Sequence, residues 1–346
     1  NWDCDNSGRA PQKAAYGLLS RVALYAEKWD VAAQAARDCA TAEGNLDLSK
    51  NGYAKIFELG INSPEVLFAV EFKSSVIDHA YDAYVRPSGD TKELGKQVYS
   101  GFVPTSELVD SYEMAGDGGN FSWEKHGKDP YANREPRFYA TILYNGADWM
   151  GRKIESFVGG KDGYKAYENA GAAGTTVTGY YLRKYLIDGD KTWVTSGSGQ
   201  DWIVLRYAEV LLNKAEALAM ENWNKNSAEA LQALNDVRAR VGLPARATAD
   251  KETFLEYVRH ERKVELAGEG FRYWDLRRWR LAEKVIDGQN VHGVKISKQS
   301  DGSFTYEQVD ADGGHKRIFY DRYYRFAIPL SERSNNSLCT NNDGWI

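Results

Sequence analysis

The residues that most suggest chemistry are three glutamates at intervals of four. Glu261, Glu265 and Glu269 would share one face of a helix, with successive Cβ atoms about 5–6 Å apart. Retaining glycosidases hold two carboxyl groups at a similar separation, so a glycoside hydrolase that uses Glu265 and Glu269 is one hypothesis. Six arginines crowd the same stretch, however, and could neutralise the carboxylates. We therefore favour a structural network and predict these buried partners for the glutamates: Arg272, Arg277 and Arg278.

Other catalytic signatures are missing from the sequence. It contains no G-x-S-x-G, H-E-x-x-H or C-x-x-C motif, and its five histidines are far apart. Gly171–Thr176 lacks the lysine of a phosphate-binding loop, and the calcium-loop-like segment from Asp310 has His315 where glycine is required. These two segments are therefore interpreted as a surface loop and a β-turn. The sequence predicts a protein that is not an enzyme and uses no metal or cofactor.

Aromatic residues offer a different chemistry. The chain has 10 Trp, 22 Tyr and 12 Phe in 346 residues, yet its mean hydropathy is −0.58, so many rings must lie in polar surroundings. A pyranose presents a flat apolar face to an aromatic ring, while its hydroxyls need amides and carboxylates. Trp123, between Ser122 and Glu124, is the leading candidate for such a platform. The full set of predicted ligand-binding rings is Trp123, Trp149, Tyr84, Tyr99 and Phe121.

Composition excludes several other classes of protein. Lys and Arg number 44 against 49 Asp and Glu, and the net charge of −5 does not suit a nucleic-acid partner. The most apolar window, Ala14–Ala26, is interrupted by Arg21, so no membrane span is predicted. Three cysteines are present at no metal-like spacing: Cys4, Cys39 and Cys339. We expect free structural thiols, with a Cys4–Cys339 bridge as the alternative.

Helical hairpins must position these residues. Apolar residues at helical spacing predict one hairpin at about 11–42 and another at about 206–241. Alanines mark the seam of each hairpin, and Trp29 and Trp223 stand at the turns, a pattern typical of tetratricopeptide-like pairs. Both hairpins should therefore dock on other helices of the same chain.

The remaining segments complete a single mainly α-helical domain that spans 1–346. The predicted parts are a long aromatic loop-rich insertion at about 46–200, a helical block at about 251–287, and a minor β-hairpin and tail at 293–346. We expect the β-hairpin to lie against the helices.

Three stretches, in family order, closely resemble signatures of the SusD/RagB family of outer-membrane nutrient-binding lipoproteins. They are Arg206–Ala217 (RYAEVLLNKAEA), Asn235–Pro244 (NDVRARVGLP) and Glu261–Trp279 (ERKVELAGEGFRYWDLRRW), the last being the most specific. Weaker similarities occur at Ser63–Ala69, Pro104–Asp110, Ile328–Glu332 and Asn341–Trp345. The resemblance thus extends over nearly the whole chain.

The resemblance implies a SusD-like fold and a non-catalytic function. It implies a lipid-anchored protein at the cell surface, on the outer membrane of a Gram-negative bacterium, that captures an oligosaccharide and delivers it to a SusC-type TonB-dependent transporter. Family members begin with a signal peptide, a lipidated cysteine and further helices, so this sequence resembles the later portion of a family protein, and Cys4 is not expected to be the anchor. Two alternatives stay open: a peptide-binding family member, and a tetratricopeptide scaffold that binds only protein.

Overall fold

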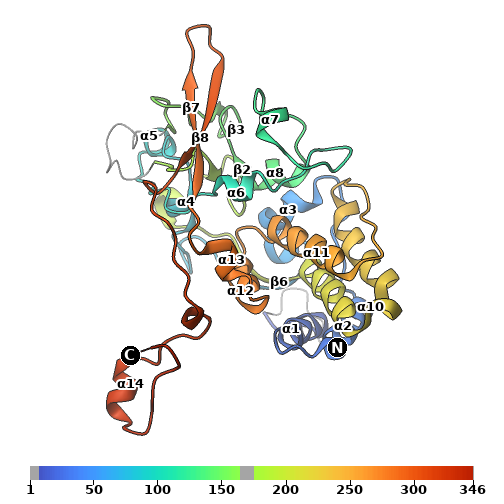
Figure 1. Ribbon diagram of the computed structural model, residues 1–346. Helices are drawn as coiled ribbons and strands as arrows, with labels where there is room; N and C mark the ends of the chain where they lie inside the picture. Colours follow the sequence, from blue (N-terminus) through green and yellow to red (C-terminus); the bar gives the residue numbers. More distant parts are fainter. Residues whose placement is uncertain (1–7, 164–174, 346) are drawn as a thin grey trace.

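The first helical hairpin consists of α1 (Gln12–Tyr25) and α2 (Trp29–Thr41). The computed structural model describes residues 8–163 and 175–345, and the hairpin lies at its N-terminal end (Figure 1). Small buried residues, including Ala14, Ala32 and Ala36, line the seam between the two helices. Alanine has no side chain beyond Cβ, so the helices can approach closely there.

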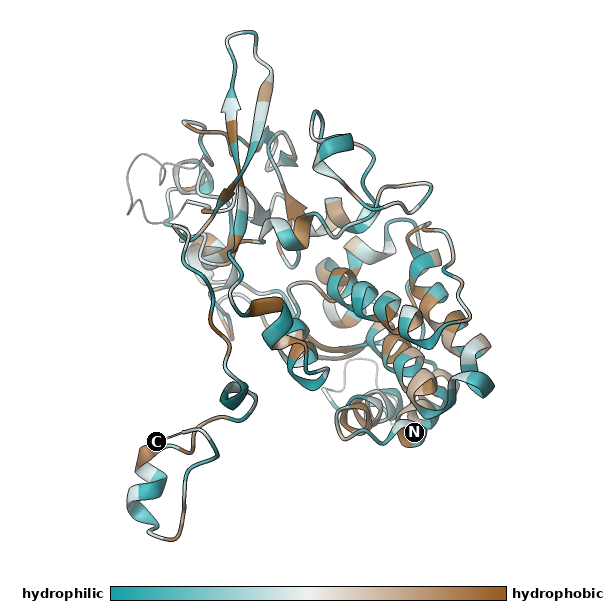
Figure 2. Ribbon diagram, viewed as in Figure 1, coloured by the Kyte–Doolittle hydropathy of each residue, from teal (hydrophilic) through white to brown (hydrophobic). Residues whose placement is uncertain are grey.

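The second hairpin is α10 (Tyr207–Arg240), which contains one break. Asn222 has φ −165° and ψ 95°, and its side-chain oxygen accepts the backbone N–H of Lys225 at 3.2 Å. Asn222 therefore ends one helix and caps the next. The first hairpin and α11 (Lys251–Glu265) both pack on α10. In Figure 2 these helices carry mixed hydrophilic and hydrophobic stripes, as expected of helices that bury one face.

The remaining helical block follows α11. It comprises α12 (Phe271–Arg278) and α13 (Ala282–Ile286), and α12 starts after Gly270, whose φ of 85° breaks the chain direction. None of the helices in the described residues is long and apolar enough to cross a membrane. The predicted mainly α-helical fold is confirmed.

A strand pair closes the insertion between the two hairpins. Strand β1 (Val66–Val70) pairs antiparallel with β6 (Trp202–Arg206), so that Val70 lies opposite Trp202. The two ends of the insertion are thereby brought side by side. Its other elements are short: α3 (Gly52–Leu59), η1 (Gly60–Asn62), α4 (Tyr81–Val85), α5 (Asp90–Leu94), α6 (Ser106–Val109), α7 (Trp123–His126), α8 (Pro136–Thr141), α9 (Trp193–Ser196), and the strand pairs β2 (Ile142–Leu143) with β5 (Tyr181–Leu182) and β3 (Asp148–Trp149) with β4 (Arg152–Lys153).

The C-terminal β-hairpin packs mainly on the insertion, which corrects the expectation that it lies against the helices. Strands β7 (His292–Lys298) and β8 (Phe304–Asp310) pair in an unbroken antiparallel register and project from the body in Figure 1. Alternate residues Val294 and Ile296 face a cluster of buried rings that includes Tyr112, Phe138 and Tyr180.

The chain ends in a tail that runs away from the helices (Figure 1). The tail contains η2 (Asp321–Tyr324) and α14 (Leu330–Asn335), and the large apolar side chains of Phe326, Leu330 and Leu338 are exposed. In the described part of the chain Cys39 and Cys339 are free thiols, whereas Cys4 lies outside the described residues.

Candidate functional site

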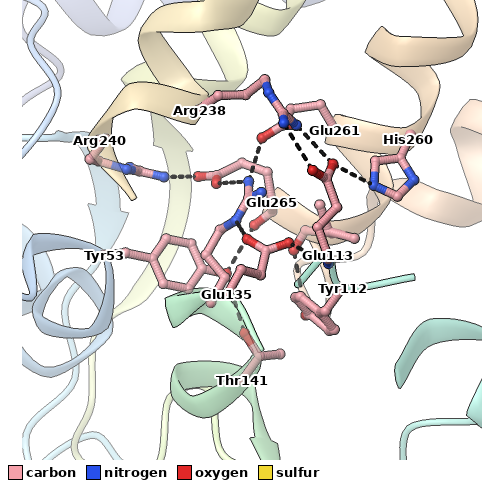
Figure 3. A network of polar contacts seen from close by, with 12 residues as sticks. Tyr53, Tyr112, Glu113, Glu135, Thr141, Arg238, Arg240, His260, Glu261 and Glu265 are labelled. Atoms are coloured by element: carbon pink, nitrogen blue, oxygen red, sulfur yellow. Dashed lines mark hydrogen bonds and ion pairs between the residues drawn. The ribbon is translucent and has the colours of Figure 1, made fainter. Parts of the chain in front are cut away.

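The glutamates of α11 lie in a buried network of charged side chains (Figure 3). Glu265 accepts hydrogen bonds from Arg137 at 2.9 Å and from Arg206 at 2.6 Å, and it also pairs with Arg240. Glu261 pairs with Arg137 at 2.5 Å and with Arg238 at 3.0 Å. Both glutamates are fully buried. We call this set the charged network: Glu65, Glu113, Glu135, Glu261, Glu265, Glu269, Arg137, Lys184, Arg206, Arg238 and Arg240.

Pairing with cations lowers the pKa of two carboxylates of the charged network, Glu265 and Glu269. Glu269, with a side chain only 3% exposed, accepts hydrogen bonds from Lys184 at 2.8 Å and Arg206 at 2.7 Å. Burial by itself raises the pKa of Glu265, but the charges of its arginine partners outweigh that effect and hold the pKa well below its usual value. Glu265 and Glu269 therefore have buried, ion-paired side chains, and this contradicts a hydrolase that uses them as accessible catalytic carboxylates.

The predicted arginine partners of these glutamates were wrong. The guanidinium of Arg277 donates to the backbone carbonyls of Tyr323 and Tyr324, and Arg278 pairs with Glu216 at 2.5 Å. Arg272 is half-buried; burial lowers its pKa, and the charge of Asp275 acts against that effect. All three predicted residues belong to α12, which follows the break at Gly270 and is joined to α11 by a different ion pair, Arg262 with Asp275 at 2.8 Å. The true partners come from α8, β6 and the end of α10, far away in sequence.

Two of the predicted ligand-binding rings do lie together on the surface. The rings of Tyr84 and Tyr99 stack at a centroid distance of 5.1 Å and an angle of 27°, and the two residues are 46% and 48% exposed. Tyr84 also lines an open hollow of about 340 Å³ beside α4. We call it the aromatic hollow, and its lining residues are Phe72, His79, Ala80, Tyr81, Tyr84, Phe102 and Trp202.

The strand pair that closes the insertion forms one side of the aromatic hollow. Trp202 begins β6, and Phe72 follows the end of β1, so antiparallel pairing brings the two rings to one edge. Asp201 holds this edge because its carboxylate accepts the backbone N–H of Phe72 at 3.2 Å and that of Ile61 at 2.9 Å. Trp202 lies flat on buried Tyr185, at a centroid distance of 4.9 Å and an angle of 14°.

His79 sits on the opposite side of this edge in a fixed orientation. Its Nδ1 accepts the backbone N–H of Tyr81 at 3.2 Å, so Nε2 carries the proton and donates to the carbonyl of Gln200 at 3.0 Å. Its ring meets Phe72 edge to face at 4.7 Å. The backbones of His79 and Ser198 also pair in both directions. The aromatic hollow is therefore held by hydrogen bonds as well as by ring contacts.

Helix α4 carries Tyr84 and is held in place by buried contacts that include Trp149. Arg86, at the end of α4, pairs with Asp82 at 2.7 Å and with Asp90 at 3.4 Å, and its guanidinium lies 5.2 Å from the ring centroid of Trp149. The Trp149 indole donates to Asp90 at 3.0 Å. Trp149 is 0% exposed, so it supports the helix and offers no face to a ligand, which corrects its prediction as a platform.

The other two predicted rings lie on α7 and beside it, apart from α4 in Figure 1. Phe121 is 9% exposed and is covered by the guanidinium of Arg134, 4.2 Å from its ring centroid, so this prediction is also corrected. Trp123 is half-buried and its indole donates to Asp110 at 2.9 Å. Part of its ring remains accessible, and its role as a platform stays a prediction.

Polar groups adjoin the aromatic hollow. A second hollow of about 590 Å³ shares His79 and Ala80 with it and is also lined by Ser75, Asp78, Lys96, Thr195 and Ser196. Its shape depends on Gly197, where φ is +75° and an added Cβ would lie 2.4 Å from the carboxyl carbon of Asp78. Hydroxyl, ammonium and carboxylate groups thus stand beside exposed rings, as recognition of a polyhydroxylated ligand requires.

Sequence reasoning missed four tyrosine, phenylalanine or tryptophan rings of the aromatic hollow: Phe72, Tyr81, Phe102 and Trp202. Phe102 follows Gly101 in a loop and is 64% exposed, so its position in the sequence could have indicated an exposed ring. Phe72 and Trp202 are 130 positions apart in numbering, and only the pairing of β1 with β6 joins them. Within residues 8–163 and 175–345, no group of three or more His, Cys, Asp or Glu side chains could hold a metal ion.

Comparisons with known proteins agree with this architecture. A SusD-like protein from Bacteroides fragilis superposes with a TM-score of 0.82 at 26% identity, over 100% of this chain and 67% of that one. A SusD-like carbohydrate-binding protein from the same species gives a TM-score of 0.77 at 27% identity, over 96% of this chain and 65% of that one. This chain therefore spans about two thirds of the length of these structures.

Sequence comparisons point the same way. SusD-like protein P38 from Formosa agariphila is 32% identical over 133 residues, which make up 36% of this chain and 25% of that protein. Residues 64–345 match the profile of the SusD family. That match covers well over half of the chain and includes all three signature stretches. The resemblance noted in the sequence is thereby confirmed, and the chain belongs to the SusD/RagB family.

Proposed function

We propose that this protein binds a glycan without cleaving it and that the aromatic hollow is the binding site. The observation that carries the proposal is the stacked, half-exposed pair Tyr84 and Tyr99, next to exposed Phe102 and Trp202 and to a polar hollow. One Bacteroides fragilis relative is described as carbohydrate-binding, which supports the ligand class. The buried ion pairs of Glu265 and Glu269 support a binding function over hydrolysis by these residues.

The energy available at the aromatic hollow suits a weak carbohydrate complex. A pyranose that covers about 100 Å² of ring surface gains about 2.5 kcal/mol, before the cost of ordering the ligand. Several rings around one hollow could engage successive sugar units. Affinity would then come from several modest contacts and not from one deep pocket.

The test is calorimetric titration with a panel of neutral oligosaccharides and a parallel panel of peptides. We expect an oligosaccharide to bind, and the double variant Tyr84→Ala, Tyr99→Ala to weaken that binding at least tenfold. Tyr273→Ala is the matched control, because Tyr273 is 45% exposed on α12, away from the aromatic hollow. Binding of peptides alone would favour the peptide-binding alternative. An unchanged affinity of the double variant would exclude this location.

Trp123→Ala distinguishes the aromatic hollow from the platform predicted from sequence. Trp123 lies on α7, whereas Tyr84 lies on α4. If the aromatic hollow is the whole site, the Trp123 variant keeps its glycan affinity. A tenfold loss would show that the bound chain extends to α7.

Family membership further supports a location on the outer membrane, at the cell surface, and delivery of the glycan to a SusC-type TonB-dependent transporter. This second part of the proposal rests on the family alone. Copurification of the transporter with the tagged full-length protein from its native membrane would test it. Absence of a transporter from the purified material would contradict it.

A further inference from the structure

A second cavity lies beside the charged network and outside the aromatic hollow. It has a volume of about 660 Å³ and is lined by residues of α3, by the segment 183–186 and by the end of α10. Aromatic rings form part of its wall, among them Tyr53, Phe57 and Tyr139. Tyr185 also lines it and stacks on Trp202 of the aromatic hollow, so the two sites share a wall.

The wall of this cavity is strongly cationic. The charged residues that line it are Lys55, Glu58, Arg134, Arg183, Lys184 and Arg240. Lys184 and Arg240 pair with glutamates of the charged network, namely Glu65, Glu265 and Glu269, but none of those glutamates lines the cavity. Because Glu58 is the only acidic residue among those that line the cavity, the lining residues carry a net positive charge.

Three buried polar groups of residues in this wall lack a hydrogen-bond partner within the described residues. They are the hydroxyl of Tyr185, a residue 2% exposed, Nε of Arg134, also 2% exposed, and Nε of Arg240, whose side chain is 1% exposed. All three groups can donate a hydrogen bond, and an unpaired buried donor is costly. A ligand with acceptor oxygens would satisfy them.

We propose that this cavity is a second ligand site, one that takes the acidic group of an anionic sugar, a carboxylate or a sulfate ester. The proposal rests on the glycan-binding function above and adds a ligand class to it. The rings Tyr53, Phe57 and Tyr185 would cover the apolar face of the sugar, while the cationic wall would hold its acidic group. Arg183 is well suited to contact the ligand, because its side chain is 33% exposed and its ion pair with Asp188 is long, at 3.9 Å.

Calorimetric titration with small probes tests the ligand class. The probes are glucuronate, glucose 6-sulfate and, as the uncharged match, glucose. We expect at least one acidic probe to bind at concentrations up to about 10 mM and glucose to bind at least tenfold more weakly. Binding of only one acidic probe identifies the acidic group as carboxylate or sulfate. Absence of binding by both acidic probes, or equal binding of glucose, would overturn the proposal.

Matched variants test the location. Lys55→Gln with Arg183→Gln removes two cations from the cavity wall, and we expect at least a tenfold loss of affinity for the acidic probe. Lys153→Gln with Lys161→Gln removes the same charge at exposed positions outside the cavity and should leave affinity unchanged. An equal loss of affinity in both double variants would show only a general effect of net charge and would contradict a specific binding site in this cavity.

Tyr185→Phe gives an independent readout. It removes only the unpartnered hydroxyl, so the melting temperature should not fall, while affinity for the acidic probe should drop several-fold. Unchanged affinity would exclude the hydroxyl as a ligand contact. The assay of the Tyr84, Tyr99 variant with neutral oligosaccharides separates the two proposals. Neutral glycans that bind when the acidic probes do not would contradict only the second site. Acidic probes that bind when neutral glycans do not would contradict only the aromatic hollow.

Discussion

The charged network buries charged side chains, whereas the aromatic hollow exposes aromatic side chains to solvent. In the charged network, Glu261 and Glu265 are fully buried, and each has more than one cationic partner. In the aromatic hollow, Tyr84 and Phe102 expose 46% and 64% of their surface although water is a poor environment for a ring. Residues with satisfied neighbours stabilise the fold, whereas residues left exposed at an energetic cost are available to a ligand.

Loss of one member of the charged network should have the largest effect on stability. Arg206 contacts Glu65, Glu265 and Glu269, so Arg206→Ala removes one buried cationic partner from each of three buried carboxylates. We expect a loss of about 3–5 kcal/mol in the free energy of unfolding, measured by urea denaturation. The control is Arg37→Ala, whose partner Glu229 is 38% exposed and whose loss should cost less than about 1 kcal/mol. Equal effects of the two variants would remove the distinction between a buried network and a surface pair.

Acid should destabilise the fold through the same region. Burial raises the pKa of Glu269, and likewise that of Asp275, but neighbouring cations outweigh this effect in both residues and lower the pKa below its usual value, as in Glu265. The unfolded chain therefore binds more protons than the folded one below about pH 5, and stability falls as the pH falls. Glu135, whose pKa burial raises, opposes the trend.

Thermal denaturation between pH 7 and pH 3 measures this effect. We expect the melting temperature to fall over that range. Glu265→Gln should lower the melting temperature at pH 7 and flatten its dependence on pH, because one of the ionised carboxylates is gone. A melting temperature that rises toward pH 3 would contradict this account of the charged network.

Trp149 links the two regions, because it is buried like the charged network but supports the helix of the aromatic hollow. Trp149→Phe keeps a ring under Arg86 but removes the donor to Asp90. We expect a loss of about 1–3 kcal/mol in stability. Glycan affinity should fall less than in the Tyr84, Tyr99 double variant. A larger fall would mean that Trp149 contacts the ligand, against its burial.

The smallest effect on stability should come from Tyr99, which stacks on Tyr84 beside the aromatic hollow. Tyr99→Ala breaks the stack with Tyr84, which is worth about 0.5–1.5 kcal/mol, and both rings are already half-exposed. The melting temperature should change little while glycan affinity falls. A large loss of stability without a change in affinity would assign this ring pair to the structure of the insertion.

The sequence determined the helical hairpins, a turn at Trp223 that the structure places next to it at Asn222, and the family, because each depends on neighbours close along the chain. It also located the insertion and two of its exposed rings, Tyr84 and Tyr99. Local spacing records which residues share a helix face, and signature stretches carry the family directly.

Only the tertiary structure decided which charges pair and which rings stay exposed. Arg137 and Glu265 meet because α8 packs beside α11, and Phe72 meets Trp202 because β1 pairs with β6. Trp149 and Tyr84 are both rings in polar loops, yet one is 0% and the other 46% exposed. Burial and ion pairing depend on contacts between segments far apart in sequence, and no local pattern of residue types encodes them.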